Sequence, residues 1–379
     1  MLDHRGAWGL HRSAIIGWML LAMLAAAAPA PAQTIDAFEV RKVDVDVTAE
    51  TAAKAREQAL ADGERAAFER LLRRLTLRSV HDRIPKLPAA EIATYVKDFD
   101  VASEKTAPDR YLARLNYRFK ADDIRGLLRD YGFAFAETPS KPVLVLPVYQ
   151  AAAARLLWDD PNPWREAWAA RPKTDSLVPL ILPLGDLADI GAIGAEQALA
   201  GDPQRLKAVA RRYNAGNTIV AHGTLALDSA SGVSVLEVVA ARHGGARDDA
   251  AIVRSFIAAD GESDDGLLRR AAAAIAVDIE DNWKLNNLLR FGRGAVMAVT
   301  VPIGGLGDWL KVRGRLGGVA VIGHTDLVLL SRDEVRLNLH YIGESDQLAV
   351  ALEQADLFLT RDEHEWFLGL TRAPAGATP

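Results

Sequence analysis

The chain contains no cysteine, so any chemistry that it performs depends on hydroxyl, histidine and carboxylate side chains. The lack of cysteine excludes disulfides, thiolate metal sites and cysteine nucleophiles, and it suits a compartment where stray thiols oxidise. A serine hydrolase needs an activated nucleophile, and neither Gly-x-Ser-x-Gly nor Ser-x-x-Lys occurs in a strand-turn-helix context. The sequence commits the chain to no reaction, and we expect a non-catalytic role.

Histidines and carboxylates gather near the carboxyl end, where a metal site would have to form. They comprise residues 362–365 (DEHE, with His364), together with His324, Asp326 and His340. Zinc bound without cysteine usually involves a His-x-x-x-His pair on a helix, and the chain has none. We therefore predict no metal and no cofactor. A metal site stays open as the alternative, because two strands of a hairpin can bring His324 close to His340.

Three tryptophans form the most conspicuous candidate binding group. Trp164 and Trp168 are four residues apart and share one face of a helix that starts after residues 161–163 (PNP), and Trp158 precedes them. Tryptophans in such a group can anchor a partner protein or stack on a sugar. Such spacing is more typical of core residues, and we keep a possible partner-binding surface of Trp158, Trp164 and Trp168 as the alternative. His222 alternates with apolar residues, which is typical of a strand residue.

Residues 1–32 have the three parts of a secretory signal peptide. Arg5 and Arg12 precede an apolar run over residues 14–28, and residues 30–32 (APA) offer a peptidase site before Gln33. The run is shorter than the roughly 20 apolar residues of a permanent span. We predict export to the periplasm after cleavage, with an uncleaved anchor as the alternative.

Composition argues against two other classes of protein. No later segment is long and apolar enough for a membrane span. The formal net charge is −5, and no basic stripe interrupts it. Nucleic-acid binding needs clustered cations, so we expect no nucleic-acid partner.

The pattern of apolar residues predicts a mixed α/β (α+β) protein made of three small modules. The first, an α/β module over residues 33–137, has a strand near residues 37–47, a long helix capped by Thr48, and two further strands. Its end merges into a Pro-containing segment, residues 137–142, which is typical of a linker.

The second module covers residues 141–291 and the third covers residues 294–370. The second opens with a continuous apolar strand at residues 143–148 and closes with a long helix that contains Trp283. The third has strand and helix signals in the order βαββαβ, which is that of a ferredoxin-like fold, with Trp309 in its first helix. Residues 371–379 are small residues and prolines, and we predict a disordered tail.

Several segments carry a resemblance to known families. Residues 59–66 (ALADGERA), residues 73–76 (RRLT), the helix with Trp309 and residues 341–343 (YIG) are similar to the exported proteobacterial family known as domain of unknown function two-zero-six-six. That resemblance implies a location in the cell envelope and implies no activity. Residues 143–148 and 217–223 (NTIVAHG) are similar to the amino-terminal domain of TolB, which implies a docking module.

These observations together predict a periplasmic binding or scaffold protein of the cell envelope, with envelope proteins as partners. Two alternatives remain. One is an enzyme acting on a wall or envelope polymer through carboxylates such as Glu363 and Glu365. The other is a small-ligand sensor with a pocket between the first and second modules.

Overall fold

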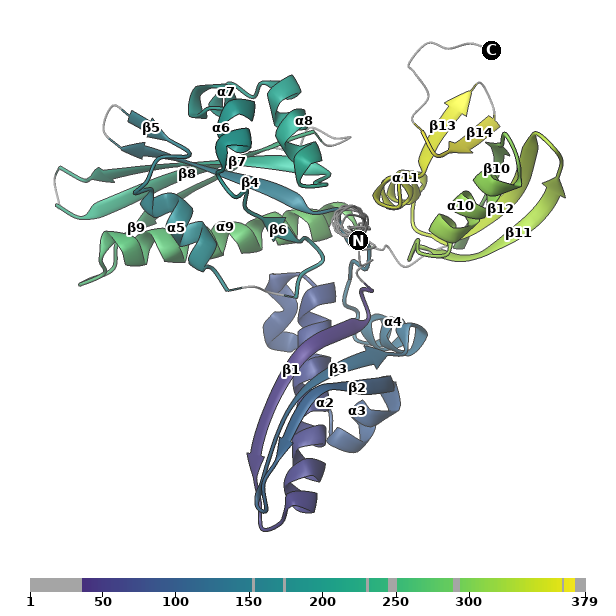
Figure 1. The fold of residues 1–379 in the computed structure, drawn as a ribbon. Coiled ribbons are helices and arrows are strands. Elements are labelled where there is room, and N and C mark those ends of the chain that lie inside the picture. Colours follow the sequence, from purple (N-terminus) through teal and green to yellow (C-terminus); the bar gives the residue numbers. More distant parts are fainter. Residues whose placement is uncertain are drawn as a thin grey trace, which may run out of the picture. The chain divides into compact units, whose positions relative to one another are not determined.

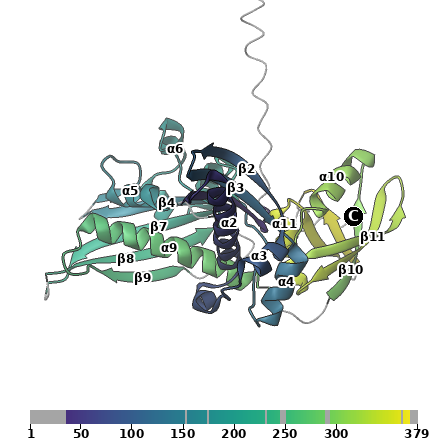
Figure 2. The same cartoon turned by 90° about the horizontal axis from the view of Figure 1, so that it is seen from below.

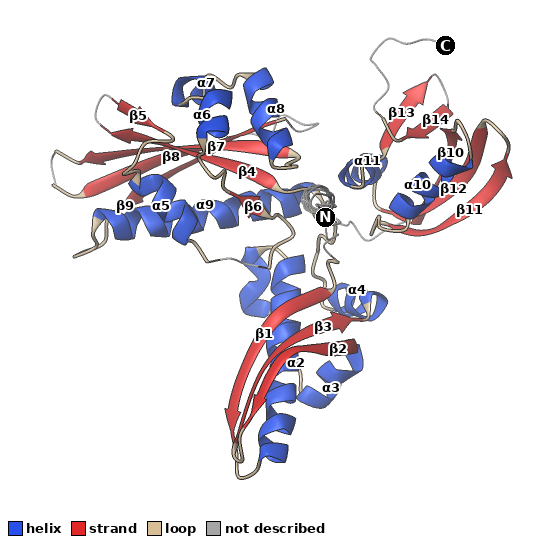
Figure 3. Ribbon diagram, viewed as in Figure 1, coloured by secondary structure: helices blue, strands red, loops and turns tan. Residues whose placement is uncertain are grey.

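The computed structural model describes residues 36–151, 154–172, 175–229, 232–244, 251–288, 294–362 and 365–371. Within these ranges the chain forms three sheets, one in each predicted module range (Figure 1, Figure 3). The predicted mixed α/β fold is therefore confirmed. The predicted signal peptide and residues 372–379 of the predicted tail lie outside the described residues.

The first module packs one long helix on a three-stranded antiparallel sheet of order β1-β3-β2. The helix begins after Thr51, whose side chain accepts a hydrogen bond from the Lys54 amide. Thr48, the predicted cap, is instead the last residue of the first strand. The elements are β1 (Glu39–Thr48), α2 (Ala52–Leu75), η1 (Arg78–Arg83), α3 (Ala89–Tyr95), β2 (Val96–Thr106), β3 (Arg110–Phe119) and α4 (Ala121–Asp130).

The second module is a mixed sheet of order β5-β4-β7-β8-β9, with β6 beside β4. β4 runs parallel to β7 and β6, and its apolar residues are buried on both faces because helices cover both sides. Its strands are β4 (Val143–Ala151), β5 (Ala154–Leu156), β6 (Leu180–Ile181), β7 (Asn217–Leu227), β8 (Ser234–His243) and β9 (Ile252–Ile257).

Two groups of helices cover this sheet. α9 (Asp264–Asn286) runs along β8 and β9 and packs against α5 (Pro163–Ala170), as Figure 2 shows. The other face carries three shorter helices over β4 and β7, and a second apolar core lies beneath them. These helices are α6 (Leu187–Ala192), α7 (Ala195–Leu199) and α8 (Pro203–Arg212).

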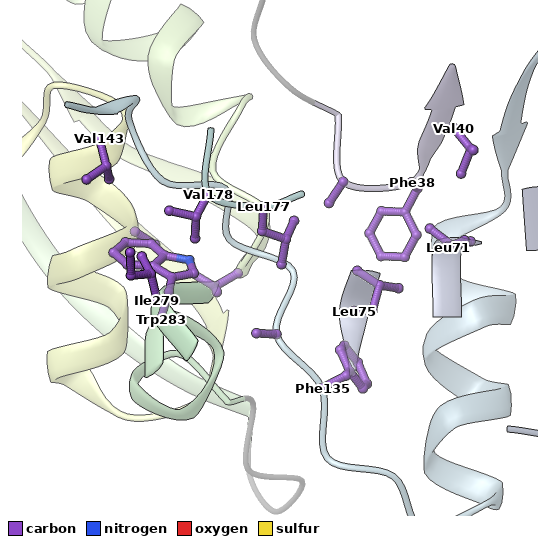
Figure 4. Close-up of a cluster of buried hydrophobic side chains, with 14 of the residues drawn as sticks. Phe38, Val40, Leu71, Leu75, Phe135, Val143, Leu177, Val178, Ile279 and Trp283 are labelled. Atoms are coloured by element: carbon purple, nitrogen blue, oxygen red, sulfur yellow. The ribbon is translucent and has the colours of Figure 1, made fainter. Parts of the chain in front are cut away.

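The segment predicted as a linker, residues 137–142, is largely buried. Glu137 is 0 % exposed and accepts two hydrogen bonds from Arg125, at 2.8 and 3.0 Å. The indole nitrogen of Trp283 donates to the Thr138 carbonyl at 2.9 Å. Figure 4 shows buried side chains around this segment, among them Phe135 and Leu177. The segment predicted as a linker thus has protein partners for its polar groups.

A buried lysine joins α9 to the carboxyl end of α2. Lys284 is 2 % exposed, and its ammonium group donates to the carbonyls of Arg73 and Thr76 at 3.1 and 2.9 Å. A cation is favourable there because the last carbonyls of a helix lack partners within the helix and carry partial negative charge. Glu280, one turn earlier, pairs with the same ammonium at 2.9 Å.

The third module has the predicted order βαββαβ with one more strand at its end. β10 and β12 form the centre of the sheet, whose order is β11-β12-β10-β14-β13. The last strand, β14, was not predicted, and it pairs in parallel with β10. The elements are β10 (Gly294–Pro302), α10 (Leu306–Leu316), β11 (Ile322–Leu330), β12 (Glu334–Ile342), α11 (Ser345–Gln354), β13 (Phe358–Asp362) and β14 (Glu365–Gly369).

None of the helices within the described residues is both long and apolar enough to span a bilayer.

Candidate functional site

The edge of the third sheet carries the most unusual surface of the described chain. β11 pairs with β12 and with no other strand of the described residues. Four consecutive apolar side chains of β11 are exposed, at 54 % for Leu327, 60 % for Val328, 41 % for Leu329 and 49 % for Leu330. Exposed edge strands are usually protected by lysine, proline or shortness, and residues 322–330 contain neither lysine nor proline.

The register explains why these side chains face outward on both sides of the sheet. Leu327 lies opposite Leu337, which is buried beneath the helices, so Leu327 is on the helix-covered face. Leu329 lies opposite Arg336 and therefore on the open face, after an irregularity in pairing between Leu327 and Leu329. An edge strand with one wet face is expected to alternate apolar and polar residues. Residues 327–330 are apolar on both faces, a pattern that marks a candidate interaction surface.

A groove of about 460 Å³ runs beside β11 on the helix-covered face. Trp309 and Leu316 of α10 form one wall, and Leu327 and Leu337 contribute to the other. Trp309 is 8 % exposed, so it supports the groove from within the core. Leu306 and Leu310, on the same helix, are 63 % and 55 % exposed and extend the apolar surface. Arg313 lies at the groove and adds a positive charge.

The open face of the same edge brings together three of the residues considered for metal binding. His324 and His340 are register partners on β11 and β12, and their rings stack with centroids 3.8 Å apart and planes 16° apart. His340 Nε2 lies 2.7 Å from Asp326 Oδ2, and His324 Nε2 lies 4.0 Å from Asp326 Oδ1. The hairpin thus produces the convergence left open above, whereas His364 lies outside the described residues.

A second pocket, of about 530 Å³, lies in the second module beside β7 and β8. Arg155 and Glu196 form an ion pair of 2.5 Å at its lining, to which His222 and His243 also contribute. His222 Nε2 is buried without a hydrogen-bond partner. Burial first, and then the charge of Arg155, lower the pKa of His222, and burial lowers the pKa of His243. The pocket is thus lined by two imidazoles with lowered pKa values and by one ion pair.

The predicted tryptophan surface is not formed, because two of its three members are core residues. Trp164 and Trp168 are each 0 % exposed and pack edge to face, with centroids 5.8 Å apart. Trp164 donates to the Ala221 carbonyl at 2.8 Å, and a side chain at Gly223 would meet its ring at 3.1 Å. Trp158 is half-buried and donates to the Ile193 carbonyl at 2.7 Å. The interpretation as a partner-binding surface is therefore wrong for Trp164 and Trp168.

Of the two carboxylates considered for an enzyme, Glu365 lines neither of the pockets described above. Glu365 is exposed on β14 opposite Asp362, and Glu363 lies outside the described residues. The pocket of the second module lies within that module, so it is not the cleft between the first two modules that a sensor was expected to use.

Neither the protein-family models nor the curated proteins contain a match to this chain. Its resemblance to domain of unknown function two-zero-six-six, and that of its second module to the TolB amino-terminal domain, therefore stay predictions.

Proposed function

We propose that this chain is an exported periplasmic binding protein of the cell envelope, with the family resemblance given above, and that it acts by holding a partner protein rather than by catalysis. Its binding surface is the β11 edge, and its ligand is an extended apolar segment of another envelope protein. That segment adds a strand to the sheet beside β11.

The observation that carries this proposal is the run of four exposed apolar residues, Leu327 to Leu330, on an edge strand. Strand addition takes affinity from main-chain hydrogen bonds and specificity from pockets for alternate side chains. The groove between α10 and β11 is such a pocket. Arg313 at the groove favours a partner segment with an acidic residue among its apolar ones.

A second copy of this chain fits the edge less well than a different protein does. Residues 322–330 have Asp326 at their centre, so an antiparallel pair of β11 strands in full overlap places Asp326 opposite its own copy. Like charges directly opposite each other destabilise a strand pair. A partner with another sequence has no such restriction.

Site-specific photo-crosslinking in cells tests the binding surface. A photoreactive residue at position 327 is expected to give an adduct with an envelope protein, and the adduct is expected to disappear when Leu329→Lys is added. Val296→Lys is the matched control, because Val296 is 58 % exposed on β10 of the same module. An adduct that maps to a second copy of the chain, or one that survives Leu329→Lys, contradicts the proposal.

Cell fractionation tests the periplasmic location separately. Release by osmotic shock of a chain that begins at Gln33 supports export and cleavage. Recovery of the intact chain in the membrane pellet contradicts export with cleavage. It does not affect the crosslinking test of the binding surface.

A further inference from the structure

We propose that His324, Asp326 and His340 form a binding site for one divalent ion of the zinc type, on the open face of the β11 and β12 hairpin. The site goes beyond the proposed function, because its three side chains lie on the open face and it does not require a partner strand, although His324 also contributes to the lining of the groove.

The backbone places all three side chains on one face. His324 and Asp326 are two residues apart on β11, so their side chains point to the same side of the sheet. His340 is the register partner of His324 on β12. The three potential ligand atoms lie within 4.8 Å of one another. Ligand atoms of a tetrahedral zinc ion are about 3.3 Å apart, as bond lengths of about 2.0 to 2.2 Å require.

The two imidazole rings are arranged so that both could bind one ion. The two imidazoles are nearly parallel, and each presents Nε2 to a different oxygen of the same carboxylate. The side chains are 63 %, 56 % and 30 % exposed for His324, Asp326 and His340, so they can close by the remaining distance without disturbing the core. The carboxylate is within hydrogen-bond distance of His340 and lies 4.0 Å from His324.

The donor set selects the class of ion. Two imidazole nitrogens and one carboxylate oxygen suit zinc and neighbouring transition ions, whereas calcium and magnesium prefer oxygen ligands throughout. Three protein ligands leave one position of a tetrahedral ion for water, and the exposure of the site allows water to reach it.

Zinc titration of the full-length, untagged protein tests the site, with competition against a coloured chelator as the readout. The parent protein is expected to bind one zinc ion per chain at this site. His340→Ala and Asp326→Asn are expected to weaken binding more than about 10-fold, because even the loss of groups behind the ligands costs roughly 10- to 100-fold. Zinc should also raise the melting temperature of the parent more than that of either variant.

His243→Ala is the matched control, because His243 belongs to the second module and contributes to a pocket with another histidine. It is expected to leave zinc binding unchanged. Equal affinity in the parent and His340→Ala, no binding at one ion per chain, or loss of binding in His243→Ala overturns the proposal. All three variants carry their changes at exposed or half-exposed positions, and circular dichroism without zinc verifies that each one folds.

Discussion

Gly63 lies where α2 approaches the sheet of the first module most closely. A Cβ atom there would be 2.6 Å from the Tyr117 hydroxyl and 3.1 Å from a methyl group of Val45. Tyr117 donates to the Leu60 carbonyl at 3.2 Å, and burial first raises the pKa of this hydroxyl. The glycine therefore serves close packing, although glycine inside a helix normally costs about 1 kcal/mol relative to alanine.

We expect Gly63→Ala to lower the free energy of unfolding by about 1 to 3 kcal/mol, because overpacking outweighs the gain in helix propensity. Urea denaturation measures the change. In a Tyr117→Phe background the same substitution should cost less, because the clashing oxygen is absent. Gly126→Ala on α4 is the control, since nothing lies within 4 Å of the added atom, and it should be neutral or stabilising. Equal losses for the two alanine variants would show that no close approach exists at Gly63.

Glu262 is held in its ionised form just before α9. It accepts from Arg270 at 2.9 and 2.7 Å and from the Ala259 amide at 2.9 Å. The hydrogen bonds from Arg270 first, and then that from Ala259, lower its pKa from 4.5 to about 2. A carboxyl group with a lowered folded pKa favours folding above its unfolded pKa, and this contribution disappears as the pH falls through about 2.

We expect an NMR titration to show the Glu262 carboxyl ionised at pH 4. Arg270→Gln should move its midpoint back toward the ordinary range, because the first cause of the shift is removed. A midpoint for Glu262 that is unchanged by Arg270→Gln would assign the shift to the backbone alone.

Among the helices, Lys284 joins α9 to the carboxyl end of α2, and a single substitution tests how much this contact contributes to stability. Lys284→Met removes the ammonium group that contacts both carbonyls and Glu280, and leaves the carbonyls only His81 Nε2, at 3.2 and 3.4 Å. We expect a loss of roughly 3 kcal/mol, the lower end for a broken buried pair, because Glu280 retains some contact with water. Thermal unfolding measures it. Lys311→Met, at a lysine that is 66 % exposed, should change stability by less than about 0.5 kcal/mol. Similar effects of the two changes would contradict the role of Lys284.

The elements of the third module could be predicted because their apolar residues repeat with clear helix or strand spacing and the turns between them are short. Val335, Leu337, Leu339 and Tyr341 alternate with polar residues and are buried in β12 as the pattern predicts. β14 was missed because a five-residue strand beside charged residues has neither a long period nor a turn signature. The helix start at Thr51 was placed three residues early, since both threonines are good caps.

The candidate sites required information that a single sequence does not contain. The apolar run at 327–330 is visible in the sequence, but its position at an edge follows from strand order. The pairing of His324 with His340 depends on the hairpin register, which one irregularity shifts by a residue. Burial of Trp164 and Trp168 depends on α5 packing toward the sheet and α9. Helical spacing alone is the same for a core face and a binding face.

Each of the three modules has its own sheet, and the third module is the one that we expect to fold independently. The third sheet takes all five of its strands from residues 294–369. We expect a fragment of residues 294–371 to unfold cooperatively on its own, because it contains a complete sheet and buried residues such as Trp309, Leu337 and Leu352. Coincident transitions in far-ultraviolet and near-ultraviolet circular dichroism measure this. A fragment without a near-ultraviolet signal or a transition would place the boundary elsewhere.

The position of β14 has a consequence for the time course of synthesis. This strand lies beside the central strand β10, although it is made after every other strand of the sheet. While residues 365–369 are still inside the ribosome, the outer edge of β10 has no neighbour and the sheet cannot be completed. A nascent chain paused shortly before that point would present two open edges, β10 and β11, to chaperones. Release of the last strand would then close one of them and leave β11 accessible.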